Sequence, residues 1–366
     1  MNERLKKLRE IGQSVWVDSL SRDDIQNGNL QRMTEDGVLG VTSNPTILQQ
    51  AIAQSELYDQ ELQKLAEKTD DPREIFRRIA VRDIRDASDI FMPVYEQTEH
   101  KDGYVSLEVS PELAFDTEGT ITRARLLWEM VDRPNLLVKI PATKESLGAI
   151  EDSIAAGISV NVTLIFSLER YRAVAEAYIR GLERLVEGGG DPSKVASVAS
   201  FFVSRVDTET DRRLEELGRE DLKGRLAIDN AKIAYQEFKK SFGSPKWESL
   251  ESRGATKQRP LWASTSTKNP EYKDTIYVDK LIGPETVNTM PLSTLKATMD
   301  HAEVRPTLEE GIDKARKLFE ELKEAGVDYD DVVEVLETEG VQKFADSYKV
   351  LIEEIEHKSN RLARHA

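Results

Sequence analysis

Eight short runs of apolar and β-branched residues recur along the chain, and segments with a helical pattern separate most of them. Runs of this length, bounded by turn residues, are typical of buried strands. Several are apolar on both faces, as expected for a parallel sheet covered by helices. The runs occupy residues 14–20 (SVWVDSL), 40–46 (GVTSNPT), 104–110 (YVSLEVS), 136–142 (LLVKIPA), 159–166 (SVNVTLIF), 195–206 (VASVASFFVSRV), 259–267 (RPLWASTST) and 286–292 (TVNTMPL).

The intervening segments place apolar residues at helical spacing. In Pro72–Tyr95 they fall near one face, and Asp71 before Pro72 is a typical N-cap followed by proline at the first helical position. Ser167–Val186 repeats the pattern before the GGGDP break at 188–192. Strands that alternate with helices indicate a parallel sheet, and eight such units predict an α/β fold, a closed (β/α)8 TIM barrel.

The predicted domain organisation is one barrel domain spanning residues 1–366. The connection 207–258 is long for one crossover and is expected to hold more than one helix. The segment 307–358 is expected to be a C-terminal helical extension packed on the barrel. Its apolar stripe consists of Val341, Phe344, Ala345, Tyr348, Leu351, Ile352 and Ile355.

Composition narrows the function classes. The 366 residues carry 51 Lys and Arg against 67 Asp and Glu, a formal net charge of −16. This balance disfavours a broad nucleic-acid surface, so local cations would have to bind any anionic ligand. No apolar run reaches the length of a membrane span, and the amino terminus (MNERLKKLRE) has no apolar signal-peptide region. We therefore expect neither a nucleic-acid nor a membrane partner.

Residue types exclude further chemistry. The chain has no cysteine, so it has no disulfide, no thiolate nucleophile and no zinc–thiolate site, which fits a cytoplasmic protein. The four histidines (His100, His301, His357 and His365) show no metal-binding spacing. We expect no metal, no other cofactor and no Ser/His/Asp triad.

Several predicted strands end in polar residues, as in a barrel whose reactive side chains gather at the carboxyl ends of its strands. Lys139 is the most informative, because a lysine within an apolar strand is costly to bury. A buried amine that is partly neutral can attack a carbonyl. Lys139 could equally reach solvent from the strand end, or pair with a carboxylate of the barrel. The other polar positions are Asp18, Asn44, Glu108, Asn161 with Thr163, Arg205, and Ser266 with Lys268.

These side chains match the needs of Schiff-base chemistry. Glu108 and Asp18 could move the protons of imine formation and bond cleavage, although strand-end carboxylates often serve only as ion-pair partners. Hydroxyl and amide groups of Asn44, Asn161, Thr163 and Ser200 could hold a polyol, or could be satisfied barrel residues. Arg205, Lys268, Ser264 and Ser266 could seat a phosphate at the last strands, or be surface groups.

Two motifs decide between these readings. GVTSNPTILQQ (40–50) resembles the first signature of the transaldolase family, and LLVKIPAT (136–143) resembles the segment around that family's Schiff-base lysine. The resemblance covers most of residues 10–300 and includes VWVDS, SLEVS, SVNVTLIFS and ASFFVSR. The length of the chain and its extended 207–258 connection resemble those of the longer bacterial branch of the family.

The resemblance implies a class I aldolase barrel without a metal. Lys139 would form the Schiff base, Glu108 would act as acid and base through a water, and Asp18 would take the proton of the substrate hydroxyl. The substrate-binding residues would be Asn44 and Asn161 on the three-carbon fragment, Thr42, Thr163 and Ser200 beside them, and Arg205, Ser266 and Lys268 on the phosphate.

Two positions depart from the family pattern. Ser146 stands where the second signature usually has glycine, and Lys268 stands where many members have a second phosphate-binding arginine. A lysine lacks the bidentate fork of arginine, so phosphate affinity is the property that this exchange affects.

The expected activity is that of a transaldolase in the pentose phosphate pathway, acting on phosphorylated sugars. Sedoheptulose 7-phosphate and glyceraldehyde 3-phosphate would give erythrose 4-phosphate and fructose 6-phosphate. The alternatives are a lysine-dependent aldolase that cleaves without transfer, and a barrel that binds sugar phosphates without catalysis. The sequence leaves monomer and homodimer both open.

Overall fold

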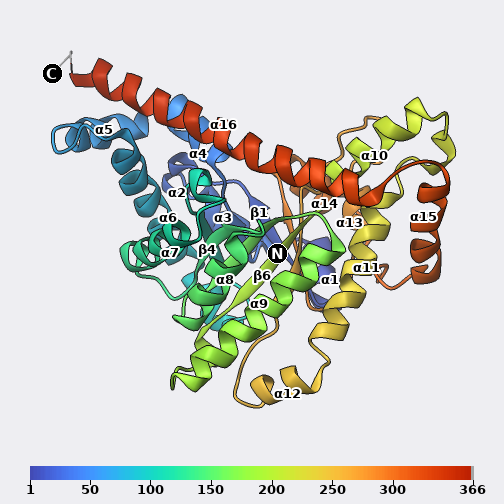
Figure 1. Cartoon of the computed structure of the whole chain (residues 1–366). Coiled ribbons are helices and arrows are strands. Elements are labelled where there is room, and N and C mark those ends of the chain that lie inside the picture. The colour runs from blue at the N-terminus through green and yellow to red at the C-terminus, as the bar shows by residue number, and fades with distance from the viewer. Residues whose placement is uncertain (364–366) are drawn as a thin grey trace.

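A computed structural model describes residues 1–363 of the chain and forms a closed parallel barrel at its centre (Figure 1). The strands follow one another around the barrel in chain order, so the predicted (β/α)8 TIM barrel is confirmed. The strands are β1 (Gln13–Asp18), β2 (Gly40–Thr42), β3 (Tyr104–Glu108), β4 (Leu136–Pro141), β5 (Val160–Ile165), β6 (Ser197–Phe202), β7 (Arg259–Ala263) and β8 (Thr286–Met290).

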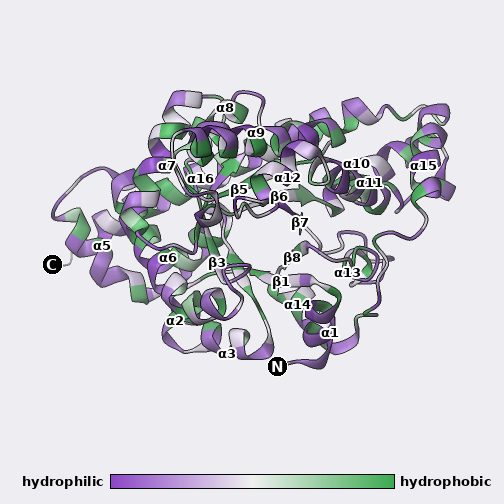
Figure 2. Cartoon of the chain, turned by 90° about the horizontal axis from the view of Figure 1, so that it is seen from below, coloured by the Kyte–Doolittle hydropathy of each residue, from purple (hydrophilic) through white to green (hydrophobic). Residues whose placement is uncertain are grey.

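Each strand lies within one of the eight predicted runs or within one residue of it. The barrel closes where β1 pairs with β8, with Gln13 opposite Thr286. Every strand residue is buried except Asp18 and Glu108, which are half-buried at the last positions of β1 and β3. Helices surround the strands, as Figure 2 shows, and this explains why both strand faces are apolar until their carboxyl ends.

Helices form the outer layer. The first half of the chain holds α1 (Glu3–Ile11), α2 (Arg22–Gln26), α3 (Asn29–Asp36), α4 (Pro45–Gln54), α5 (Asp59–Ala66), α6 (Pro72–Gln97), α7 (Thr117–Val131) and α8 (Ser146–Ala155). The second half holds α9 (Leu168–Glu187), α10 (Ser204–Glu216), α11 (Leu226–Ser241), α12 (Pro245–Glu251), α13 (Ile276–Asp279), α14 (Leu292–His301), α15 (Ile312–Glu324) and α16 (Tyr329–Ala363).

The two helices predicted in detail are confirmed. Asp71 caps α6 by accepting a hydrogen bond from the backbone N–H of Arg73, and Pro72 is the first helical residue. Ser167 caps α9 in the same way, through the N–H of Arg170. The connection 207–258 contains most of α10 and all of α11 and α12, so it holds more than one helix, as expected.

The C-terminal helix α16 runs along one side of the molecule in Figure 1 and contacts α4, α5, α6 and α10. The predicted stripe of this helix is buried, with Ala345 partly so. The assignment of residues 1–366 to a single domain stays a prediction. No helix among residues 1–363 is both long and apolar enough to cross a membrane.

Candidate active site

A pocket at the carboxyl ends of the strands collects polar side chains from every part of the barrel. Its lining confirms the expectation that strand-end polar residues meet at one face. Of the predicted site residues, Glu108 and Asn161 lie beside the lining and contact it through hydrogen bonds. The predicted residues that line the pocket are Asp18, Thr42, Asn44, Lys139, Thr163, Ser200, Arg205, Ser266 and Lys268.

Lys139 is the centre of this pocket. Its side chain is only 6% exposed, because β4 lies between β3 and β5 in the barrel wall. The Nζ atom donates to the carbonyl oxygen of Ser43 at 3.1 Å and to Oε2 of Glu108 at 3.3 Å. The ammonium therefore has one carboxylate partner and still faces the pocket, where an incoming carbonyl can reach it.

Two carboxyl groups flank the lysine. Burial raises the pKa of Glu108, and the nearby charge of Lys139 and its hydrogen bond partly offset that rise. Burial likewise raises the pKa of Asp18, with Lys139 and a hydrogen bond from Thr42 acting in the opposite direction. Carboxyl groups with raised pKa values hold a proton closer to neutral pH, which suits acid–base exchange.

A chain of hydroxyl groups supports Asp18. Thr42 donates to Oδ1 of Asp18 at 2.7 Å, and the Thr42 and Thr289 hydroxyls lie 2.7 Å apart. Thr289 also lines the pocket from β8 and was not among the predicted site residues, although its predicted run, TVNTMPL, contains the polar pair Asn288 and Thr289. Together these contacts hold the Asp18 carboxylate in one orientation.

A second polar network lies across β3, β5 and β6. Asn161 donates to Ser106 at 3.1 Å and accepts from Ser200 at 2.7 Å, so its amide is fixed at both ends. Thr163 differs, because its hydroxyl is buried without a hydrogen-bond partner among the described residues and lines the pocket. An unsatisfied buried hydroxyl is costly, which favours a bound water or substrate hydroxyl at this point.

Asn44 links the pocket to helix α4. Its side-chain oxygen accepts a hydrogen bond from the N–H of Ile47 at 3.0 Å and so caps the helix, while Pro45 occupies the first helical position. The amide NH2 group of Asn44 is left available to a substrate oxygen. The NPT sequence therefore positions one polar group through the local rules of helix capping.

Cations gather at the end of the pocket formed by β6 and β7. Arg205 lies in the first turn of α10, with its guanidinium 5.4 Å from the ring centre of Phe202. Lys268 donates to Ser266 at 2.8 Å in the loop after β7. Partial burial, Arg205 and then Lys343 of α16 lower the pKa of the Lys268 ammonium, so three cations share this corner. Such a cluster suits a phosphate group.

Helix α16 supplies a wall that the site-residue prediction missed. Phe344 is buried, lines the pocket and has its ring centre 5.5 Å from Nζ of Lys139. Its position in an apolar helical stripe predicts burial, but no local signal brings it to a lysine some 200 residues earlier. The sequence also gives no sign that Lys343, a charged residue on the exposed face of this helix, lies near Lys268.

Backbone strain accompanies the site. Leu164 follows Thr163 with φ 60°, and the pairing of β5 with β6 shifts register between Val162 and Ile165. Ser264 follows β7 with φ 55°, and its hydroxyl lies 2.9 Å from that of Ser204. Left-handed conformations of non-glycine residues cost about 1–3 kcal/mol each and often mark functional positions.

Ser146 has a structural place. It is buried at the start of α8, and its hydroxyl donates to the carbonyl oxygen of Ala114 at 3.1 Å and lies 2.9 Å from that of Thr143. This departure from the family pattern therefore ties the loop after β4 to the loop after β3.

The three histidines within residues 1–363 do not line the pocket. His100 stacks on Tyr95, and His301 contacts Asp274 and Asp300, while His365 lies outside the described residues. Within residues 1–363, no group of three or more His, Asp or Glu side chains is arranged to hold a metal ion.

Comparison with known proteins identifies close relatives. A family profile described as "Transaldolase/Fructose-6-phosphate aldolase" matches residues 15–355. A "Transaldolase" from Frankia alni is 50% identical over 366 residues, covering 99% of this chain and 99% of the relative. A "Transaldolase 2" from Streptomyces coelicolor is 49% identical, covering 99% of both chains. A "Transaldolase" from a Parafrankia species is 52% identical, covering 97% of this chain and 98% of the relative.

Proposed function

The chain belongs to the transaldolase family, and from this membership we propose that the residues around Lys139 carry out its Schiff-base reaction. The activity is that of a transaldolase, the transfer of a three-carbon dihydroxyacetone unit from a ketose phosphate to an aldose phosphate in the pentose phosphate pathway. The donor is sedoheptulose 7-phosphate and the acceptor is glyceraldehyde 3-phosphate. The products are erythrose 4-phosphate and fructose 6-phosphate.

One observation carries the assignment of roles. The amine of Lys139 lies 3.3 Å from Oε2 of Glu108, in a pocket that Asp18 also lines. Glu108 takes a proton from the Lys139 ammonium, and the neutral amine adds to the C2 carbonyl of the ketose. Glu108 then returns the proton with which the carbinolamine loses water. The product of these steps is an iminium ion on Lys139.

Cleavage follows from the iminium ion. Asp18 takes the proton of the C4 hydroxyl, the C3–C4 bond breaks, and its electron pair passes into the iminium to give an enamine. The aldose fragment leaves as an aldehyde. The amide groups of Asn44 and Asn161 hold the hydroxyls of the three-carbon fragment until the acceptor aldehyde arrives and the steps reverse.

Different residues of the pocket bind the sugar hydroxyls and the phosphate of the substrate. Thr42, Thr163 and Ser200 contact the sugar hydroxyls. The Thr163 hydroxyl has no hydrogen-bond partner among residues 1–363, which favours this role. Arg205, Ser266 and Lys268 bind the phosphate. Phe344 covers Lys139, and this cover limits access of water to the enamine.

The test is chemical trapping. Incubation with fructose 6-phosphate and borohydride should reduce the iminium, and peptide mapping should find the added mass on Lys139 alone. Lys139→Ala should abolish both adduct and activity. An adduct on another lysine, or an undiminished rate in this variant, would overturn the assignment.

The matching family profile also includes fructose-6-phosphate aldolases, which makes cleavage without transfer the second candidate. Free dihydroxyacetone would accumulate in that case, whereas a transferase passes the unit to the acceptor. Measuring both products in one reaction separates the two activities. We also propose a cytoplasmic location, because the chain lacks cysteine and its pathway handles phosphorylated sugars.

A further inference from the structure

The loop between β7 and α13 carries Ser266 and Lys268 and has no regular secondary structure of its own. Its first residues are held on the barrel, where Thr265 donates a hydrogen bond to Asn288 at 3.0 Å. In the described part of the chain, the hydrogen bonds of residues 266–271 stay within the loop, as when Lys268 donates to Ser266. The segment assigned to the phosphate therefore depends on an anchor at its far end.

Tyr272 provides this anchor shortly after Lys268. Its hydroxyl donates to Oδ2 of Asp211 on α10 at 2.6 Å, and Oδ1 of the same carboxylate accepts the backbone N–H of Gly224 at 2.8 Å. The tyrosine ring lies directly on Gly224, where a β-carbon would come within 2.9 Å of it. Gly224 also has φ +70°, so both the backbone and the close approach of the ring favour glycine there.

Asp207 repeats this arrangement one helical turn earlier on α10. Its Oδ1 accepts the N–H of Ala227, in the first turn of α11, at 2.7 Å, and its Oδ2 accepts from the Tyr277 hydroxyl at 2.8 Å. Asp207 and Asp211 are four positions apart and so lie on one face of the helix. Each acid binds one backbone N–H near the start of α11 and one tyrosine hydroxyl from the segment after β7. Together they tie that segment to α10.

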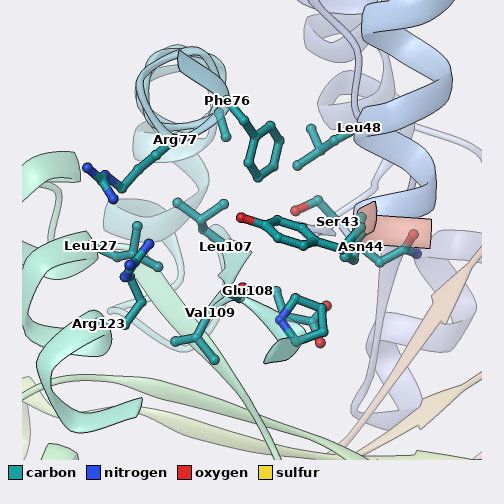
Figure 3. A pocket seen from close by; sticks show the side chains of 15 residues that line it. Ser43, Asn44, Leu48, Phe76, Arg77, Leu107, Glu108, Val109, Arg123 and Leu127 are labelled. Atoms are coloured by element: carbon teal, nitrogen blue, oxygen red, sulfur yellow. The ribbon is translucent and has the colours of Figure 1, made fainter. Parts of the chain in front are cut away.

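This tie affects the phosphate pocket because α10 also carries Arg205. Arg205 precedes Asp207 in the first turn, and among residues 1–363 its guanidinium has no carboxylate partner within ion-pair distance. Arg77 is the contrast, since it lies in the narrow space on the outer side of Glu108 in Figure 3 and contacts Glu74. An ion pair therefore holds Arg77, whereas the position of Arg205 relative to the loop depends on how α10 is held.

We propose that Tyr272 is a positioning residue for phosphate binding, acting through Asp211 on the loop that carries Lys268. Its hydroxyl fixes this loop on the helix that carries Arg205, so that the cations of both elements face one phosphate. A site that is already ordered loses less conformational freedom when the ligand binds. Without the hydroxyl the phosphate keeps Arg205 but meets Ser266 and Lys268 in a less ordered loop. This inference rests on the phosphate site of the proposed function.

Tyr272→Phe removes one oxygen atom and leaves the ring on Gly224. The Michaelis constant for fructose 6-phosphate should rise about two- to fivefold with little change in kcat, because the loss should not exceed the contribution expected for Lys268. With fructose, which lacks the phosphate, kcat/KM should be the same in wild type and variant. Asp211→Asn should act like Tyr272→Phe, because its NH2 group would face one of the two donors.

A double-mutant cycle tests whether Tyr272 acts through the loop. In a Lys268→Ala background, Tyr272→Phe should have little further effect on the Michaelis constant, because the loop then has no cation to position. A hydroxyl that only stabilises the fold would contribute the same factor in both backgrounds. Tyr235→Phe is the matched control, since its hydroxyl donates to the carbonyl oxygen of Pro284, before β8, at 3.2 Å and should leave the Michaelis constant unchanged. Thermal melting verifies that each variant is folded.

Five results would overturn the proposal. These are an unchanged Michaelis constant in Tyr272→Phe, an equal loss with fructose, the same factor in the Lys268→Ala background, an Asp211→Asn variant without effect, and an equal rise in Tyr235→Phe. Borohydride trapping in the wild type separates them from failure of the proposed function. With a normal adduct on Lys139 they refute only the role of Tyr272, whereas the absence of that adduct would refute both.

Discussion

Replacing Arg205 by alanine should impair catalysis with phosphorylated substrates much more than replacing Lys268. Arg205 is half-buried beside Phe202, and among residues 1–363 it has no carboxylate within ion-pair distance. Burial lowers the pKa of its guanidinium, and the more distant charge of Glu339 only partly offsets this. A phosphate is therefore the partner that we propose for this cation.

The magnitude follows from the two environments. Hydrogen bonds to a charged group contribute about 1.5–3 kcal/mol, so loss of Arg205 should lower kcat/KM about 10- to 150-fold. Lys268 is partly buried by the pocket but remains the more exposed of the two cations, so solvent screens its charge. Exposed charges contribute about 0.2–1 kcal/mol, so its loss should cost about fivefold at most. Lys343 also remains near the Lys268 position and supplies part of the lost charge.

A two-by-two comparison tests this reasoning. Wild type and Arg205→Ala are assayed with a phosphorylated ketose and with the same ketose lacking its phosphate, and Lys268→Ala is run in parallel. The penalty of Arg205→Ala should largely vanish for the unphosphorylated ketose, because the partner of the guanidinium is then missing in both proteins. Equal losses on both substrates would show that Arg205 maintains the barrel and does not bind phosphate.

Three further predictions concern the acids, the helix that covers the site, and pH. Glu108→Gln should slow formation and hydrolysis of the imine. Asp18→Asn should still form the trapped adduct but should cleave the C3–C4 bond about 10²- to 10⁴-fold more slowly in single-turnover kinetics. Near-normal turnover in both variants would show that these acids have only a structural role. Phe344→Leu should raise the ratio of free dihydroxyacetone to transferred product, since it opens the cover above Lys139, and an unchanged ratio would contradict the shielding role. Burial raises the pKa of Asp207 to about 7. Between about pH 4 and pH 7 the folded state therefore holds a proton that the unfolded state has lost. The free energy of unfolding should fall by about 1.4 kcal/mol for each unit by which the pH rises in this range. Asp207→Asn should flatten that slope in urea unfolding at pH 5 and pH 7, and an unchanged slope would refute the assignment.

The alternation of buried strands and amphipathic helices could be predicted from the sequence because it is a local property. All eight strands lie at the predicted places, and the capped start of α6 follows from Asp71 and Pro72. Parallel strands in a closed barrel bring their carboxyl ends to one face, so the polar residues there were expected to meet. Lys139 could be singled out because burying a lysine ammonium in an apolar strand is costly, so its presence there calls for a chemical reason.

The tertiary structure alone decided which distant segments complete the site. Phe344 and Lys343 belong to a helix whose sequence predicts only that one face is buried. Folding places the buried Phe344 against Lys139 and brings the exposed Lys343 close to Lys268. Periodicity states which side of an element is buried, whereas the partner of that side depends on packing between elements far apart in the chain. The wall over the lysine is therefore a property of the folded molecule.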